Sequence, residues 1–221
     1  MQPRTETQPT YPQAVAARFS DAYGDADAVV AFGEGEITLQ VYSVDFVAYI
    51  DFEFEAVSPL TDDLRQQFIW DSRGDYLANF RLSLTSAVPV VCNDETLLAP
   101  LDIRLEQGNN SMRTELTLVW ADIPHTVSAS YCEFECLLDD LARRLPPSVY
   151  LKNCYNCLYS DYSPFGKSGF GDMQCHRNEK AAYLAVKTKR DYFEMRNAIR
   201  VQETFLCPEW EKRIKGTGYC G

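Results

Sequence analysis

The sequence predicts an α+β protein in which an antiparallel sheet domain with covering helices precedes a cysteine-rich, zinc-stabilised C-terminal part. Three observations support this prediction. Apolar and polar residues alternate over several short runs that Gly- and Asn-rich turns separate, a pattern typical of antiparallel strands with one covered face. A run with helical spacing follows these strands and ends at two prolines. Cysteines then recur as a C-x2-C pair, a third after a long loop and a fourth in an LCPEW segment.

The composition is that of a globular protein. With 221 residues and 46% hydrophobic side chains, the chain is long enough to bury a core of its own. It contains no apolar run of about 18 residues and no signal-peptide pattern, so neither a membrane span nor secretion is expected. The expected compartment is therefore the cytoplasm. In that reducing environment the eight cysteines favour metal binding over disulfide bonds.

The charge of the chain is distributed unevenly. The formal net charge is -11, but residues 1–150 hold 9 Lys and Arg against 24 Asp and Glu, which gives -15. Residues 151–221 hold 12 basic against 8 acidic residues, which gives +4. An acidic field repels nucleic acid and anionic membranes and attracts basic partners. We therefore expect a protein partner rather than nucleic acid, with solubility of the chain as the alternative role of these acidic residues.

Three regions are expected: a loose tail at residues 1–13, a β-rich acidic domain at residues 14–147 and a cysteine-rich zinc-binding part at residues 148–221. The tail is rich in Pro, Thr and Gln, which bury too little apolar surface to offset the entropy of ordering. Within the acidic domain, helices are expected at residues 14–23, 58–70 and 129–145, and strands at residues 37–41, 46–54, 76–88, 97–107 and 112–120. The C-terminal part is expected to hold short strands at residues 148–153, 183–186 and 201–207 and a basic helix from Thr188.

The alternation between the first two strands changes phase near Val44 and Asp45. Such a change indicates either a bulge or a reversal between two strands, and we prefer two adjacent strands. On the second strand Asp51, Glu53 and Glu55 would share the polar face. Side chains on one face repeat about every 6–7 Å, a spacing that suits a metal or an acid/base pair. A solvated face that protects a sheet edge is the alternative interpretation.

The cysteine spacing predicts a zinc site. Two thiolates of a C-x2-C pair, Cys154 and Cys157, reach one ion from a single turn, and Cys175 and Cys207 would complete a tetrahedral set. His176 is the alternative ligand. Four protein ligands leave no open position for substrate, so the zinc would be structural. Four buried thiols and a redox C-x-x-C pair are the competing interpretations.

The remaining cysteines suggest packing rather than chemistry. Cys132 and Cys136 lie one helical turn apart, where they would suit either a metal or the core. We favour the core, because buried cysteine behaves as a small hydrophobic residue. The sequence assigns Cys92 and Cys220 no role beyond packing.

Aromatic residues follow the C-x2-C pair, and catalytic motifs are lacking. Tyr162 and Phe165 are expected at the rim of a small core beneath the cysteine loop, where they form a candidate binding surface. The chain contains only two histidines, His125 and His176, which limits general acid/base catalysis. The sequence therefore assigns no catalytic residues.

The cysteine segment CYNCLYSDYSPFGKSGFGDMQCHRN, the later QETFLCP and the closing GTGY resemble an uncharacterised bacterial family classed as a domain of unknown function. The resemblance is strongest over residues 149–221. It implies a bacterial cytosolic protein and brings no catalytic residues. Members of that family tend to end in Arg-Gly, whereas this chain ends in Cys220-Gly221.

The function expected from the sequence is a non-catalytic interaction protein, with an immunity or antitoxin-like protein that neutralises a basic effector as its most concrete form. The alternative is a metal-dependent hydrolase that uses the strand carboxylates Asp51, Glu53 and Glu55. A zinc-based nucleic-acid binder that uses residues 187–200 is disfavoured by the total charge.

Overall fold

The structure is a computed structural model. It describes residues 13–32, 36–49, 52–109, 111–130, 134–163, 173–201, 203, 207, 209–214 and 216–218. Residues 1–12 of the expected tail, together with Asp51, Cys132, Phe165 and Cys220, lie outside the described residues.

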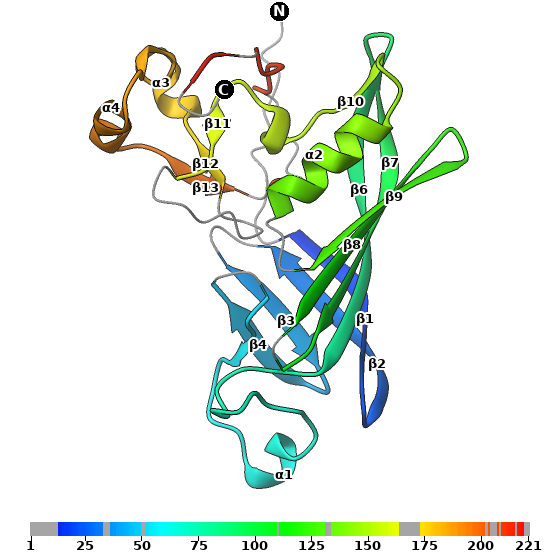
Figure 1. The fold of residues 1–221 in the computed structure, drawn as a ribbon. Coiled ribbons are helices and arrows are strands. Elements are labelled where there is room, and N and C mark those ends of the chain that lie inside the picture. The colour runs from blue at the N-terminus through cyan, green and yellow to red at the C-terminus, as the bar shows by residue number, and fades with distance from the viewer. Residues whose placement is uncertain are drawn as a thin grey trace, which may run out of the picture.

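The main body of the molecule is one large antiparallel sheet, as the alternation predicts (Figure 1). Its strands lie in the order β5-β4-β3-β2-β1-β6-β7-β8-β9, and β10 pairs with β6. The first nine strands are β1 (Gln13–Asp21), β2 (Gly24–Phe32), β3 (Ile37–Val41), β4 (Val44–Ala48), β5 (Glu55–Ala56), β6 (Phe80–Cys92), β7 (Glu95–Gln107), β8 (Met112–Trp120) and β9 (Ile123–Ser130). The α+β class is confirmed, and β2 and β9 are additional strands that the sequence patterns did not indicate.

The core lies on one face of this sheet because the strands present their apolar residues in register. Leu82 of β6 stands opposite Leu105 of β7, and Leu84 stands opposite Ile103. All four side chains belong to one continuous core. Burying a leucine or isoleucine side chain contributes about 1.5–3 kcal/mol, so this face supplies most of the stabilisation of the sheet.

The phase change near Val44 is a reversal between two adjacent strands, as predicted. Tyr42 and Ser43 connect β3 to β4 with φ angles of 49° and 61°, the left-handed conformation of a tight hairpin turn. The second strand is shorter than predicted, because β4 ends at Ala48.

The predicted helix at residues 14–23 is wrong, because these residues form β1. Val15 and Phe19 lie four residues apart and fit a helix, but they also fit alternation with period two. β1 lies between β2 and β6 and pairs with both. Phe19 is consequently buried and stacks on Phe80. Strand pairing on two edges outweighs the weak local preference.

Two of the expected helices are present in the sheet domain. α1 (Asp62–Arg65) is shorter than predicted and begins after Thr61, whose side chain accepts a 3.4 Å hydrogen bond from the Leu64 amide. α2 (Phe134–Arg144) lies across the sheet (Figure 1) and adds its apolar side chains to the main core. Cys136 on α2 is exposed, so the expectation that it packs in the core is wrong.

The C-terminal part is built from short elements, and it starts within the large sheet because β10 (Val149–Leu151) pairs with β6. A second, three-stranded sheet follows, in the order β11-β12-β13. The remaining elements are the 3-10 turns η1 (Cys154–Asn156) and η2 (Arg177–Glu179), the strands β11 (Ser160–Asp161), β12 (Met173–Cys175) and β13 (Ile199–Val201), and the helices α3 (Lys180–Ala185) and α4 (Lys189–Glu194).

The helices of this part differ in how well the sequence predicts them. The strand expected at residues 183–186 is wrong, because Tyr183 and its neighbours form α3, a segment rich in the helix formers Ala and Leu. The basic helix after Thr188 is confirmed as α4, with a complete capping box between Thr188 and Asp191. Among the described residues, no helix is long and apolar enough to cross a membrane.

Candidate metal centre and its surroundings

The C-x2-C pair forms a tight, buried turn. The Asn153 side chain accepts a 3.1 Å hydrogen bond from the Asn156 amide, and the Cys157 amide donates 3.1 Å to the Cys154 carbonyl. The Ser160 hydroxyl also donates to the Cys154 carbonyl. These bonds place both thiols at the start and end of one turn, the arrangement that lets two cysteines bind one ion.

The other two predicted ligands come from distant segments and lie in the same region. Cys175 ends β12, the middle strand of the small sheet. Cys207 begins a turn that the Trp210 amide closes at 3.2 Å, and the Trp210 indole N–H donates to the Asn153 carbonyl at 2.7 Å. Cys154, Cys175 and Cys207 share one small core, and all four predicted thiols are at most 3% exposed.

The thiols act on one another electrostatically. Burial raises the pKa of Cys154 well above its ordinary value, and the other three predicted thiols raise it further. Burial also raises the pKa of Cys175, although the Arg177 amide and guanidinium oppose this. As placed, however, no group of three or more described His, Cys, Asp and Glu side chains is arranged to hold a metal ion. The residue types suit zinc, and binding it requires the thiols to rearrange.

Arg177 is part of the thiol cluster, and the sequence patterns did not identify it. Its guanidinium donates from Nη1 to the Cys207 sulfur over 3.9 Å. Burial lowers the pKa of Arg177, but the nearby thiols of Cys175 and Cys207 outweigh burial and raise it. A cation at this position favours the thiolate form that metal binding requires. The adjacent C-H-R sequence is the only signal that could have pointed to it.

His176 lies in a separate polar network. It is fully buried and stacks on the ring of Tyr183 at 4.5 Å. Its Nε2 lies 3.0 Å from the Tyr192 hydroxyl, and its Nδ1 lies 3.4 Å from a Glu179 carboxylate oxygen. Burial lowers the pKa of His176 despite that carboxylate. Because both ring nitrogens have partners, Cys207 suits the fourth ligand position better than His176 does.

Buried tyrosines extend this network through the C-terminal part. The Tyr183 hydroxyl donates 2.8 Å to Asp161, and the Tyr192 hydroxyl donates 2.9 Å to Gln174. Gly218 packs against the Tyr183 hydroxyl so closely that any Cβ at this position would overlap it. This contact gives a physical reason for the second glycine of the GTGY segment.

The predicted carboxylate site is not assembled on one strand. Glu53 is exposed and belongs to no strand, and Glu55 lies in β5, which is separate from β4. The prediction that these residues share one strand face with Asp51 is therefore wrong, because the chain leaves β4 at Ala48. Tyr162 is buried, and its hydroxyl donates 3.0 Å to Glu203, so it does not lie at an exposed rim.

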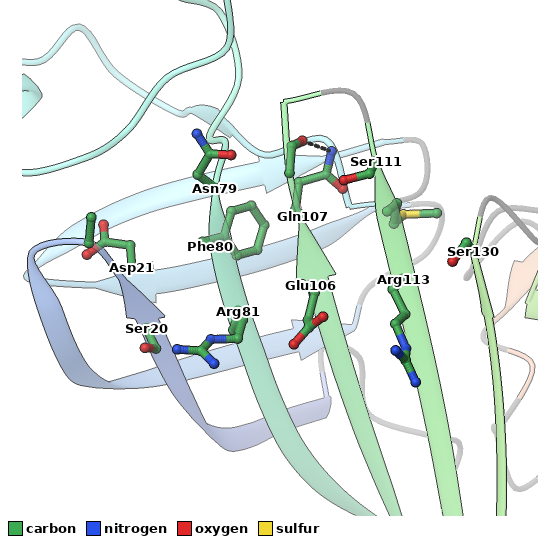
Figure 2. Close-up of a pocket in the computed structure, with 13 residues that line it drawn as sticks. Ser20, Asp21, Asn79, Phe80, Arg81, Glu106, Gln107, Ser111, Arg113 and Ser130 are labelled. Carbon is green, nitrogen blue, oxygen red and sulfur yellow. Dashed lines mark hydrogen bonds between the residues drawn. The ribbon is translucent and has the colours of Figure 1, made fainter.

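A polar hollow of about 540 Å³ lies on the sheet beside the β1, β6, β7 and β8 strands. Figure 2 shows Arg81, Glu106 and Arg113 on three adjacent strands of this hollow, with Asp21 at its border. One carboxylate oxygen of Asp21 is buried without a hydrogen-bond partner among the described residues. Three serines, Ser20, Ser111 and Ser130, line the hollow, but neither cysteine nor histidine does.

Comparison with known proteins gives a family and no activity. A family model described as a family of unknown function (DUF6304) matches residues 13–160. The match covers the large sheet, α2 and the C-x2-C turn and ends before Cys175. No curated protein and no solved structure matches the chain.

Proposed function

The chain belongs to the family of unknown function DUF6304, and we propose from its own residues that it is a non-catalytic interaction protein whose C-terminal part is stabilised by zinc. In its most specific form it is an immunity or antitoxin-like protein of the bacterial cytoplasm that neutralises a basic effector. Its partner is a protein, and its charge disfavours nucleic acid.

The observation that carries this proposal is unpaired acidic charge on the sheet domain. Between residues 53 and 75, the stretch that includes β5 and α1, five carboxylates make no ion pair with a described residue: Glu53, Glu55, Asp62, Asp63 and Asp75. Figure 1 shows α1 at one end of the sheet. The two arginines of the same segment are already engaged. Arg65 donates to the Gly74 carbonyl and lies over the Trp70 ring, and Arg73 contacts Asp71. This negative charge is left for a cationic partner.

The zinc proposal is supported by the composition of the thiol cluster. Four thiols from three segments gather under the C-x2-C turn, and four thiolates complete the coordination that structural zinc prefers. Cys154, Cys157, Cys175 and Cys207 would hold the ion, with Arg177 offsetting part of their charge. When bound, zinc would cross-link these segments and supply folding energy rather than catalysis.

Metal content tests the zinc site. Protein purified under reducing conditions without added metal is expected to hold about one zinc ion per chain, and Cys157→Ser and Cys207→Ser are expected to lose it. Cys136→Ser is the matched control, because Cys136 is exposed on α2. Zinc-free protein with an intact C-terminal part contradicts the proposal.

Partner capture tests the interaction role. The full chain, immobilised at low salt in an extract of its native host, is expected to retain a basic protein that moderate salt releases, because salt screens charges beyond about 8 Å. A variant in which Asp62, Asp63 and Asp75 are replaced by Asn is expected to retain less of it. Recovery of chaperones alone contradicts the interaction role.

No observation favours the alternative, a metal-dependent hydrolase. It requires carboxylates that converge on one ion, and Glu53 and Glu55 do not share a strand.

A further inference from the structure

One end of the sheet has a backbone edge that no described strand covers. The β6–β7 ladder continues to the pair Cys92 and Glu95, whereas the β7–β8 ladder ends at Leu101 and Leu118. Residues 95–100 of β7 are therefore paired on the β6 side alone. Figure 1 shows the tips of the β6–β7 and β8–β9 hairpins diverging at this end of the sheet.

The hairpin turn determines which backbone groups point to the free side. Asn93 and Asp94 form a two-residue turn with φ angles of 50° and 66°, so Cys92 and Glu95 make the first hydrogen-bonded pair. Hydrogen-bonded and non-hydrogen-bonded pairs then alternate along the ladder. Thr96 and Leu98 consequently direct their N–H and C=O groups away from β6.

A contact on the far side of β6 agrees with this assignment. Pro89 stands opposite Leu98 and has no N–H to donate to β7. Its carbonyl faces the other way and accepts a 2.8 Å hydrogen bond from the Lys152 amide. The pair is therefore non-hydrogen-bonded, as the alternation from the turn requires.

Proline also explains why β8 does not continue along this edge. Pro100 faces the β8 side in the same alternation and has no N–H, so the next bond of the β7–β8 ladder cannot form. The ladder ends one residue later, at Leu101. No described residue accepts a hydrogen bond from the amides of Thr96 and Leu98 beyond it, so these amides can pair with another chain.

Side chains at this edge combine apolar surface with negative charge. Leu97 is 49% and Leu98 67% exposed, and as neighbours in a strand they lie on opposite faces. Asp94 and Glu95 are exposed and make no ion pair with a described residue. A strand added here would cover both leucines and bring its own side chains close to the two carboxylates.

We propose that the free edge of β7 at residues 96–98 binds an extended, basic segment of a partner protein by strand addition. The segment pairs its backbone with Thr96 and Leu98 and places Lys or Arg side chains against Asp94 and Glu95. A second copy of this chain is disfavoured, because residues 1–150 of both copies carry a formal net charge of -15 and repel each other. The inference rests on the proposed interaction role and adds a second contact surface, at the end of the sheet opposite α1 (Figure 1), together with the form of the partner segment that binds there.

A pair of peptides tests the backbone contacts without changing the protein. The probe is a fluorescent peptide of alternating Lys and Val, and its match is N-methylated at every residue, so it keeps the charge and lacks N–H donors on both edges. Binding to the full chain is measured by fluorescence anisotropy at low salt. Methylation is expected to weaken binding at least about tenfold. Equal binding of the two peptides indicates adsorption by charge only and overturns the proposal, as does no binding.

Two variants locate the peptide on the protein. Leu98→Pro removes the outward N–H and keeps the β6–β7 ladder, and Leu98→Thr shortens the side chain but keeps the N–H. The proline variant is expected to weaken binding about tenfold and the threonine variant less than about threefold. Equal affinity in both variants overturns the proposal. The variant D94N/E95Q is expected to bind more weakly with a smaller salt dependence.

The captured partner separates this inference from the proposed function. A basic protein that the native chain and Leu98→Pro retain equally leaves the interaction role standing and overturns strand addition. A native chain that retains no basic protein contradicts the interaction role, whereas the methylated peptides still decide whether the β7 edge accepts a strand.

Discussion

The sheet domain and the C-terminal part are stabilised by different kinds of contact. The sheet domain buries a continuous apolar face from β1 to α2. Of the six buried polar or charged residues among the described ones, five lie after residue 150: Asn153, Ser160, Asp161, His176 and Glu203. Apolar contacts tolerate small shifts, whereas buried polar groups need specific partners. Loss of one polar contact in the C-terminal part should therefore disturb only the elements next to it. Loss of an apolar side chain in the sheet core should lower the stability of the whole sheet domain.

Zinc removal is expected to give the largest difference between the two regions. A structural zinc contributes on the order of 10 kcal/mol in small modules, and the C-terminal part has few apolar contacts to replace it. Chelation under reducing conditions should raise amide hydrogen exchange across residues 154–218 and leave the β6 and β7 amides protected.

Two outcomes of the exchange experiment contradict this contrast. Equal loss of protection in both regions shows that β10, which pairs with β6, couples them into one cooperative unit. Unchanged exchange after chelation shows that metal does not stabilise the C-terminal part.

A cavity in the sheet core is expected to have the second largest effect. Leu82 is almost fully buried on β6, and Leu82→Ala should lower the free energy of unfolding by about 2–5 kcal/mol. Leu98→Ala is the matched control on the same sheet, because that side chain is exposed, and it should cost less than about 0.5 kcal/mol. Chemical denaturation measures both. Similar costs for the two variants contradict the assignment of the core face.

Sequence patterns predict the sheet well because its strands alternate over long runs. β6 to β8 follow the expected alternation. β1 cannot be recognised from its sequence, because the spacing of Val15 and Phe19 fits both the helical period and the strand period. Only its pairing with β2 and β6 decides between them. α3 shows the opposite error, because a short run around Tyr183 has too few residues to establish a period.

The four cysteines of the candidate site are predictable from the sequence, and their surroundings are not. The spacing of Cys154, Cys157, Cys175 and Cys207 is visible in the sequence, and the structure buries all four. Arg177 and the partners of His176 depend on how three segments fold against one another, which no local pattern encodes. The predicted carboxylate site is wrong because the chain reverses between β4 and Glu55. The alternation of apolar and polar residues does not indicate this reversal.

Gly218→Ala is expected to have an intermediate effect, because it tests a single polar contact of the C-terminal part. Gly216 and Gly218 both have positive φ angles, 83° and 75°, but a Cβ at Gly218 alone would overlap the Tyr183 hydroxyl. Gly216→Ala should cost about 1–2 kcal/mol for the backbone conformation. Gly218→Ala should cost about 1–3 kcal/mol more for the overlap.

Local hydrogen exchange is the measurement for this pair, because the overlap displaces Tyr183 from Asp161. Gly218→Ala should speed exchange in α3 and β11 and leave β6 unchanged. Equal exchange in the two alanine variants contradicts a specific contact between Gly218 and Tyr183.

Removal of the α4 cap is expected to have the smallest effect. The Thr188 side chain accepts a 3.2 Å hydrogen bond from the Asp191 amide, and Thr188→Ala should cost about 1 kcal/mol, confined to α4.

Hydrogen bonds from the Lys187 amide and from the side chain and amide of Thr188 lower the pKa of Asp191. Because its folded pKa is lowered, the contribution of Asp191 is present above its unfolded pKa and is lost as pH falls through its folded pKa. Amide exchange in α4 is corrected for the exchange rate of an unfolded peptide. If the corrected rate does not change as pH falls through the unfolded and folded pKa of Asp191, the role of the cap is contradicted.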